Sequence, residues 1–279
     1  MSKIWSRQQA LRLSRLHDEL HSISGAFFTL LASIVCFSHL AVAGTEPRPI
    51  LAPDSEPDIQ LHVVTEQWVP YNFINQHGEV DGRATQKVRE VLDTAGISYE
   101  ILVFPWTRAM KIAQTQPNTM IYSIFRTSDR EAKFEWACPL LRPVKEHLFR
   151  LTSREDIQLD SLDDAKRYIT ALVRGSVVHE YLLSKGFKGG VNLDVSADPS
   201  SLIKKLLAGR VDFLITTEYT IFESLRLLGK PYEVVTSALE VRERTGERAC
   251  MAFHPHTDSD IINKVRRALA EHNRHYIGP

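Results

Sequence analysis

The sequence lacks an excess of charge and contains few cysteines. Its 34 lysines and arginines equal its 34 aspartates and glutamates, and 3 of its 279 residues are cysteine. Because balanced charges set up no global field, we expect neither nucleic acid nor an anionic membrane as a partner. With 43% hydrophobic and 24% charged residues, the composition is that of a globular protein with a buried core. A small molecule is the expected target.

The sequence also lacks the short motifs of common catalytic and nucleotide-binding sites. It has no Gly-x-Ser-x-Gly elbow, no phosphate-binding loop and no dinucleotide fingerprint, and it shows no internal repeat or low-complexity tract. Nothing in the sequence demands catalysis. We therefore expect a protein that is not an enzyme and that needs no cofactor.

The first 43 residues have the order of a secretory signal peptide. Four basic residues precede the apolar run Ala26–Leu40, and the small residues Ala41-Val42-Ala43 follow it. The alternative is an uncleaved membrane anchor, but the run is shorter than the roughly 20 apolar residues that a span needs. Lipidation at Cys36 is disfavoured because bulky residues precede it. We expect cleavage after Ala43, export to the periplasm, and an extended, proline-containing leader over residues 44–58.

Beyond residue 58, short runs rich in β-forming residues alternate with amphipathic runs of helical length. The expected strands are Gln60–Thr65, Tyr99–Phe104, Thr119–Phe125, Tyr168–Val173, Val211–Thr216 and Cys250–His254. The expected helices are Ala84–Thr94, Thr107–Gln114, Val177–Ser184, Ser200–Leu207, Glu218–Leu228 and Ser259–His272. This alternation favours an α/β fold with mostly parallel sheets, in which ligands bind beyond the carboxyl ends of the strands.

Several ordered segments carry a resemblance to a known family. In the first part of the chain they are Val63–Tyr71, Gly78, Gly82 and Phe104–Ala109. Further along they are Arg126–Glu131 before Phe134-Glu135-Trp136, then Val173–Ser176 and Ala208–Asp212. Each segment alone recurs by chance, but the ordered set extends from about Ile59 to Asn273. The set resembles the amino-acid-type (family 3) periplasmic solute-binding proteins.

The resemblance implies a type II periplasmic binding protein fold, with two α/β lobes joined by two hinge strands. Each lobe would be a mostly parallel sheet flanked by helices. Lobe 1 would comprise residues 59–142 and 238–279, and lobe 2 residues 143–237. We place the two crossings near Pro139–Lys145 and Tyr232–Glu240. The ligand would lie in the cleft, and closure about the hinge would trap it.

Two cysteines, Cys138 and Cys250, remain after the expected cleavage. An oxidising compartment favours their pairing, whereas isolated cysteines are equally compatible with buried thiols. In the topology that the resemblance implies, the strands that carry the two cysteines are near neighbours. The resemblance therefore predicts a disulfide between them.

Two positions within the resembling segments are suited to bind an anion. Arg130 matches the carboxylate-binding arginine, whose planar guanidinium would grip a ligand carboxylate through two parallel hydrogen bonds. The alternative is a surface arginine paired with Asp129 or Glu131. Gly175-Ser176 lies between a strand and a helix, where free backbone N–H groups favour an anion. An ordinary turn with Ser176 as the helix N-cap is compatible with that role.

The family also places apolar or aromatic walls around its ligand. Trp68 and Trp106 match such positions, and Tyr71 follows nearby. Ser123 matches a position that offers a polar contact. The alternative for each tryptophan is an ordinary core residue, and for Ser123 a half-buried serine in a strand.

Two departures from the family pattern leave the ligand open. In the family, an acidic residue receives the α-amino group of the ligand, but this sequence has Thr217 at that position. The adjacent Glu218 is either its substitute or an ordinary residue in the first turn of a helix. Arg108 and Arg126 lie near the expected cleft and would add positive charge to it. The alternative is that each is solvated or paired with an acidic residue. If both face inward, a ligand more negative than a neutral amino acid is favoured.

Two histidine patterns suggest metal chemistry only weakly. His254-Pro255-His256 with Asp258 has ligand types for a transition ion, but the proline and the loop setting disfavour a site. His179-Glu180 has half of a zinc-protease signature without its second histidine, so we interpret it as a solvent-facing pair. We expect no metal.

The resemblance favours a monomeric binding protein that carries a small polar, carboxylate-bearing solute, such as an amino acid, to an ABC permease in the inner membrane. A ligand-sensing partner of a membrane receptor is the first alternative. A dehydratase-like enzyme on the same fold is the second, and a cleft containing a general acid or base with a shifted pKa would favour it.

The first testable prediction concerns export. Protein recovered from the periplasm should begin at or near Gly44, because the small residues at positions 41–43 form a cleavage site. Intact-mass analysis measures this directly. A membrane-retained species that begins at Met1 would contradict the prediction.

Overall fold

The computed structural model describes residues 59–241 and 248–275. The expected signal peptide and leader, residues 1–58, lie outside the described residues. The described part contains two five-stranded sheets and a two-stranded hairpin. Within it, no helix combines the length and the apolar character needed to cross a membrane.

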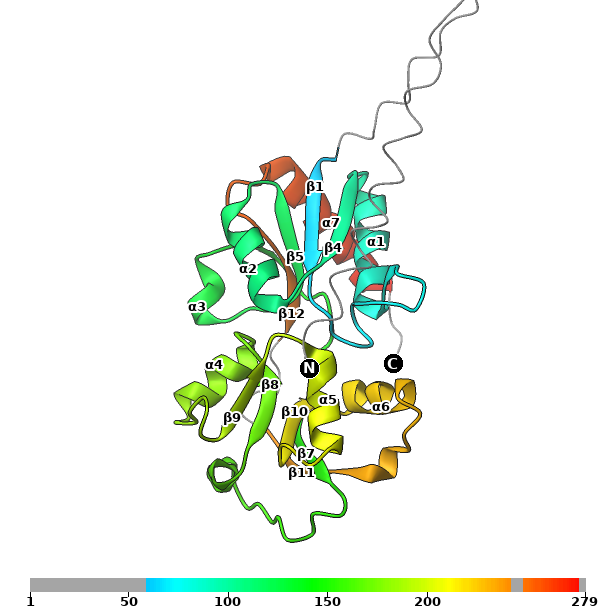
Figure 1. The fold of residues 1–279 in the computed structure, drawn as a ribbon. Coiled ribbons are helices and arrows are strands. Elements are labelled where there is room, and N and C mark those ends of the chain that lie inside the picture. The colour runs from blue at the N-terminus through cyan, green and yellow to red at the C-terminus, as the bar shows by residue number, and fades with distance from the viewer. Residues whose placement is uncertain (1–58, 242–247, 276–279) are drawn as a thin grey trace, which may run out of the picture. The chain divides into compact units, whose positions relative to one another are not determined.

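The first sheet has the strand order β4-β1-β5-β12-β6 (Figure 1). Its strands are β1 (Leu61–Thr65), β4 (Tyr99–Val103), β5 (Thr119–Phe125), β6 (Glu135–Ala137) and β12 (Ala249–Phe253). β1 pairs in parallel with β4 and β5, whereas β12 is antiparallel to β5 and β6. The parallel half of the sheet therefore ends with the carboxyl termini of β1, β4 and β5 along one edge.

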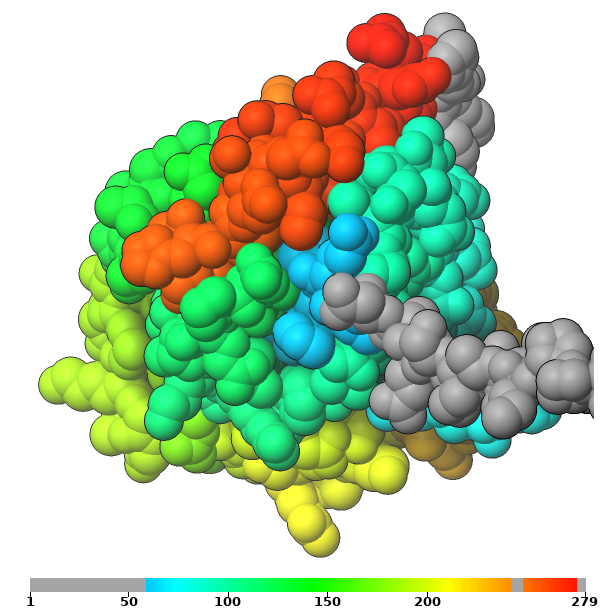
Figure 2. Space-filling view, turned by 90° about the horizontal axis from the view of Figure 1, so that it is seen from above, coloured from blue at the N-terminus to red at the C-terminus, as the bar shows by residue number. Residues whose placement is uncertain are grey.

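Helices cover both faces of the first sheet. They are α1 (Arg83–Ala95), α2 (Trp106–Thr115), the short α3 (Ser128–Glu131) and α7 (Ser259–His275). α1 packs against α7, and Figure 2 shows the two side by side. Their apolar residues share a core with Met120 and Tyr122 of β5, while α2 packs on the opposite face with Ile121 and Ile124. Every residue of β5 is buried because both faces are covered.

The second sheet has the strand order β11-β7-β10-β8-β9. Its strands are β7 (Glu146–Leu151), β8 (Thr170–Val173), β9 (Leu193–Ser196), β10 (Phe213–Thr217) and β11 (Val235–Glu240). β8 pairs in parallel with β9 and β10, whereas β7 is antiparallel to β10 and β11. Like the first sheet, this sheet has a parallel half and an antiparallel edge.

The helices of the second sheet also lie on two faces. They are α4 (Val177–Ser184), α5 (Pro199–Leu207) and α6 (Glu218–Leu227), with short 3-10 helices η1 (Leu162–Arg167) and η2 (Tyr232–Val234). α4 shares a core with Phe213 and Ile215 of β10, while α5 and α6 pack on the face that carries Leu214. Asp198 caps α5 through its side chain and Pro199 begins the helix, as the residue preferences at helix N-termini predict.

The structure confirms the expected fold class, and all six expected helices are present. The strand patterns of the sequence did not indicate β7, β9 or the hairpin of β2 (Phe73–Ile74) and β3 (Val80–Asp81). The strand that the resemblance implies at Cys138 is β6, which ends one residue before it. The segment Tyr232–Glu240, expected to cross between the lobes, instead forms η2 and the edge strand β11 of the second sheet. The residue ranges assigned to the lobes remain a prediction.

The predicted disulfide is present. Cys138 follows β6, Cys250 lies in the neighbouring strand β12, and their sulfur atoms are 2.06 Å apart. Cys250 belongs to the core beneath α2, and the partly buried Cys138 packs against this core. The bond joins residues separated by 112 positions, so the closed loop is long.

Reduction of this disulfide should lower the free energy of unfolding by roughly 4 to 5 kcal/mol, because the unfolded chain regains the entropy of a long loop. Urea unfolding of oxidised and reduced protein measures the difference. Thiol titration of the denatured, unreduced chain beginning at residue 44 should find no free thiol. Two reactive thiols would show that the bond does not form.

Candidate functional site

A pocket of about 330 Å³ lies where the carboxyl ends of parallel strands from both sheets meet. The first sheet contributes residues that follow β1 and β5, and the second contributes residues that follow β8 and end β10. This is the edge at which α/β proteins bind ligands. Of the predicted site residues, six line the pocket: Trp68, Trp106, Ser123, Arg130, Ser176 and Thr217.

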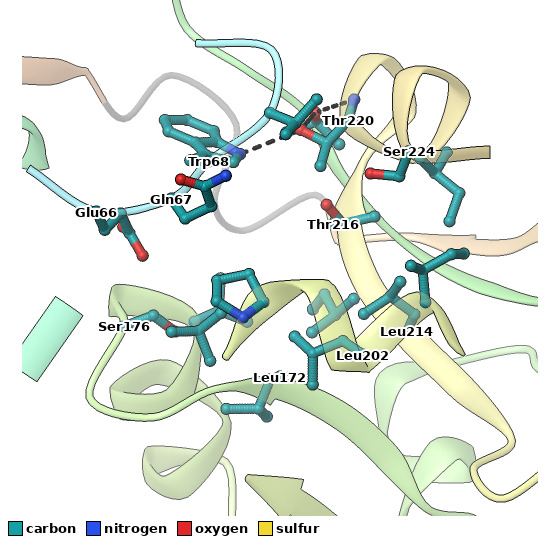
Figure 3. Close-up of a pocket in the computed structure, with 18 of the residues that line it drawn as sticks. Glu66, Gln67, Trp68, Leu172, Ser176, Leu202, Leu214, Thr216, Thr220 and Ser224 are labelled. Atoms are coloured by element: carbon teal, nitrogen blue, oxygen red, sulfur yellow. Dashed lines mark hydrogen bonds between the residues drawn. The ribbon is translucent and has the colours of Figure 1, made fainter. Parts of the chain in front are cut away.

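The pocket wall has a polar end, an apolar middle and a hydroxyl-bearing end. Figure 3 shows Glu66 and Ser176 facing each other at one end. Aliphatic side chains from β8, α5 and β10 line the middle, and hydroxyl groups from β10 and α6 gather at the other end. The labelled residues of the middle are Leu172, Leu202 and Leu214, and those of the hydroxyl end are Thr216, Thr220 and Ser224.

Arg130 in α3 is 3% exposed and makes contacts with both sheets. Its Nη2 donates to the two carboxylate oxygens of Glu180 in α4, at 3.0 and 2.9 Å. Longer contacts reach the carbonyl oxygens of Phe125 and Gly175, at 3.5 and 3.4 Å. Nε is buried and has no hydrogen-bond partner among the described residues. The guanidinium therefore retains one unpaired N–H, which is buried within the wall of the pocket.

The partner of Arg130 corrects two sequence interpretations. Arg130 is buried and does not pair with Asp129 or Glu131. The His179-Glu180 pair is not simply solvent-facing: Glu180 is half exposed but holds Arg130, and His179 Nδ1 accepts the N–H of Gly175 at 3.0 Å. Burial lowers the pKa of His179, which favours the neutral ring that this acceptor role requires.

The Gly175-Ser176 turn is largely occupied by contacts within the protein. The N–H of Gly175 is taken by His179, and its carbonyl accepts from Trp106 Nε1 at 2.6 Å. Gly175 has φ 66, a left-handed conformation that suits glycine. Ser176 is the N-cap of α4, since its Oγ accepts the N–H of His179 at 3.2 Å. Ser176 lines the pocket, whereas Gly175 does not.

The aromatic residues form part of the first-sheet wall. Trp68 lines the pocket and donates from Nε1 to Thr220 Oγ1 at 3.1 Å, a contact between residues of the two halves. Trp106 also lines the pocket, and its side chain is otherwise buried. Tyr71 stacks behind Trp68 at a centroid distance of 4.3 Å but does not line the pocket. Burial raises the pKa of Tyr71, and a hydrogen bond with Thr217 opposes the shift.

Ser123 is an irregular residue in an otherwise regular strand. It has φ 60, and the pairing of β5 with β12 shifts register at this point. Such a bulge re-aims side chains and often accompanies a functional site. Ser123 Oγ donates to the buried Asn72 Oδ1 at 2.6 Å, and Asn72 Nδ2 donates to the Glu66 carbonyl at 2.8 Å. Asn72 thus ties the bulge to the segment that follows β1.

The remaining predicted residues lie elsewhere or are already engaged. Thr217 caps α6 by accepting the N–H of Thr220 at 3.1 Å. Glu218 is exposed, does not line the pocket, and accepts from Tyr232 at 3.3 Å. Arg126 pairs with Glu131 at the surface, and exposed Arg108 lies over the Phe104 ring. Neither arginine lines the pocket, so the structure does not support the more negative ligand that two inward arginines would favour.

Glu66 is a pocket residue that the sequence analysis did not single out. It follows β1 directly and lines the pocket. Desolvation by burial raises the pKa of its carboxyl to about 8, against the opposing effect of the Arg130 charge. Its place after a buried strand was visible in the sequence, but a glutamate there has no distinctive pattern.

The described residues assemble no group of three or more histidine, cysteine, aspartate or glutamate side chains suited to a metal ion. In the His254-Pro255-His256 segment, the Nδ1 of His254 accepts the backbone N–H of His256 at 3.0 Å. This contact fixes a turn.

Comparison with solved structures identifies the fold. A histidine kinase sensor domain with similarity to periplasmic binding proteins matches with TM-score 0.68 and 19% identity, over 77% of this chain and 91% of that chain. An ancestral arginine-binding protein bound to arginine matches with TM-score 0.67 and 19% identity, over 77% and 92%. An arginine-specific periplasmic binding protein of Salmonella typhimurium matches with TM-score 0.66 and 13% identity, over 77% and 94%.

The chain therefore has the two-lobed fold of periplasmic binding proteins. No protein-family model matches the sequence, and no curated protein matches it.

The contact between Arg130 and Glu180 generates a prediction about stability. Glu180→Gln should lower the free energy of unfolding by about 1 to 3 kcal/mol, because the substitution leaves a buried guanidinium without its countercharge. The matched control is Glu131→Gln, which removes the exposed partner of Arg126 and should have a smaller effect. Urea unfolding of the two variants tests the difference, and equal losses would contradict it.

Proposed function

We propose that this protein captures a small solute in the pocket between its two sheets. The observation that carries the proposal is the buried Arg130 in the pocket wall, whose Nε lacks a hydrogen-bond partner among the described residues. Buried polar groups are nearly always satisfied, so this donor is suited to an acceptor on a bound molecule. The pocket volume suits a metabolite-sized ligand.

The acceptor that fits Arg130 best is a carboxylate. A guanidinium binds it through charge-assisted hydrogen bonds, and Nε, which is buried and unpaired among the described residues, would have to be uncovered by a shift of the pocket wall to donate one of them. Ser176, Trp68 and Trp106 would then contact the rest of the solute. Similar folds bind arginine and glutamine in solved structures, which supports an amino acid or a related acid as the solute.

The biological setting that we propose is the periplasm, with a cleaved signal peptide and delivery of the solute by a monomeric carrier to an ABC permease. This proposal extends the family 3 resemblance of the sequence. Sensing is the second candidate, because one similar structure is the sensor domain of a histidine kinase. The genes adjacent to this one discriminate the two: permease and ATPase genes favour transport, and a signalling receptor favours sensing.

One observation favours an enzyme as a further candidate. Glu66 is a pocket carboxyl with its pKa raised to about 8, as expected for a general acid or base. We favour binding, because the structures similar in fold include binding proteins and a sensor domain. Chemical change of a bound solute during incubation would favour catalysis.

The test is a thermal-shift screen of anionic, neutral and cationic metabolites, including L-arginine and L-glutamine. A ligand at about 100 times its Kd adds roughly 2.7 kcal/mol of stability. For any carboxylate-bearing hit, Arg130→Ala should weaken binding by roughly 100-fold, and Arg130→Lys should restore only part because the fork of donors is lost.

The control for this experiment is Arg126→Ala, which removes a surface arginine four residues away in sequence and should leave the affinity unchanged. Calorimetry measures each Kd. If Arg130→Ala binds as tightly as the wild type, Arg130 is not the anchor. If the screen finds no stabilising solute, the proposal of solute capture fails.

A further inference from the structure

The pocket needs an acceptor for any positive charge on the solute, and the two residues named from the sequence do not supply one. The Thr217 hydroxyl is neutral, accepts the N–H of Thr220 and donates to Thr220 Oγ1 at 2.9 Å. Glu218 is exposed and outside the pocket wall. A solute that carries an ammonium group would therefore find no countercharge at either position.

Glu66 is placed to supply this countercharge. Its carboxyl lines the pocket and forms no hydrogen bond with any side chain or backbone group of the described residues. Figure 3 shows it at the polar end, facing Ser176, the N-cap of α4. Its backbone is fixed, because Asn72 Nδ2 donates to its carbonyl and Asn72 is fully buried. The backbone at Glu66 is thus held in position, and the described residues make no hydrogen bond to its carboxyl.

Glu66 and Arg130 lie close enough to interact electrostatically, and both line the same pocket. Glu180 already neutralises part of the Arg130 charge. An anionic group at Arg130 and a cationic group at Glu66 would complete both interactions at once. The two groups of such a solute would be close neighbours, as an amine and a carboxylate on one carbon atom are.

We infer that Glu66, and neither Thr217 nor Glu218, accepts the cationic group of the solute at the polar end of the pocket. This inference rests on the proposed function, since it assumes that a solute binds beside Arg130. It makes Glu66 the residue that distinguishes an amino acid from the corresponding acid without an amine.

The rest of the wall indicates the body of the solute. Leu172, Leu202 and Leu214 leave an apolar middle, and the hydroxyls of Thr216 and Ser224 lie beyond it. Apolar surface favours hydrocarbon, whereas hydroxyl groups favour a hydrogen-bonding end. The class of solute is an amine-bearing acid with a mainly apolar body that ends in a polar atom.

Binding of an ammonium group at Glu66 should change the protonation state of its carboxyl. Burial keeps this carboxyl protonated at neutral pH, since its pKa is raised to about 8, whereas a bound ammonium stabilises the ionised form. Binding should therefore release a proton at pH 7. The other charged side chains that line the pocket are Arg130, Glu146 and Lys204, with Glu180 on the far side of Arg130. Of these, Arg130 is the charge that opposes the pKa shift of Glu66.

The experiment uses pairs of solutes that differ only in the amine. They are L-leucine with 4-methylpentanoic acid, L-methionine with 4-(methylthio)butanoic acid, and L-tyrosine with 3-(4-hydroxyphenyl)propionic acid. In the wild type, at least one amino acid should bind roughly 10- to 100-fold more tightly than its partner, because a charge-assisted contact is gained. Its affinity should rise from pH 7 to pH 8.5 as Glu66 loses its proton more easily.

Glu66→Gln should reduce this preference to within about threefold and abolish the pH dependence, because the amide cannot ionise. Calorimetry at pH 7 in phosphate and in Tris should detect release of about one proton for the wild type and none for the variant. The matched control is Glu79→Gln, in the exposed turn of the β2-β3 hairpin, which should behave as the wild type.

The outcomes separate this inference from the proposed function. If both members of every pair bind equally, or if none of the amino acids binds, Glu66 is not the acceptor. If Glu66→Gln keeps the preference for the amino acid, the inference is also wrong, while loss of binding in Arg130→Ala would still support solute capture. If Arg130→Ala leaves the affinity of the acids without an amine unchanged, the proposed anchor fails.

Discussion

A guanidinium removed from water is the constraint on which the rest of the site depends. Arg130 is 3% exposed, and such a charge needs a partner within the protein. The partner comes from the second sheet, because Glu180 lies in α4 and Arg130 in α3. Separation of the two halves would break this pair, so contact between the sheets and neutralisation of Arg130 are coupled. The pocket is bounded at one end by this contact.

Glu66 differs from Arg130, because its carboxyl has no hydrogen-bond partner among the described residues. Its position depends on a relay that begins in the irregular strand β5. The bulge at Ser123 directs a hydroxyl to Asn72, and Asn72 holds the backbone of Glu66. The left-handed conformation of Ser123 is thus associated with the placement of a pocket residue that follows another strand, β1. Within the described residues, the Arg130 guanidinium is paired with Glu180 except at Nε, and the Glu66 carboxyl makes no hydrogen bond.

Much of the fold was predictable, because β5 and the six long helices have patterns that local sequence specifies. The place of β11 at the edge of the second sheet was not predictable. The sequence of Val235–Glu240 fits a connection between the lobes equally well, and only its pairing with β7 assigns it to the sheet. Arg130 was singled out through its motif, and the structure places it in the pocket wall. Glu180 was missed because the pair joins residues 50 positions apart on different elements, and no periodicity reports such a contact. Glu66 lay within a recognised segment, but its lack of a partner is a property of the folded chain.

The disulfide has a topological consequence. All five strands of the second sheet, β7 to β11, lie between Cys138 and Cys250. In the oxidised protein, the chain from Cys138 to Cys250 and the disulfide therefore form a covalent ring that contains the second sheet. The two segments that connect this sheet to the first sheet both begin at the disulfide. A single backbone cut anywhere inside the ring would linearise it without releasing a fragment. The second half would remain tethered at both of its ends to β6 and β12.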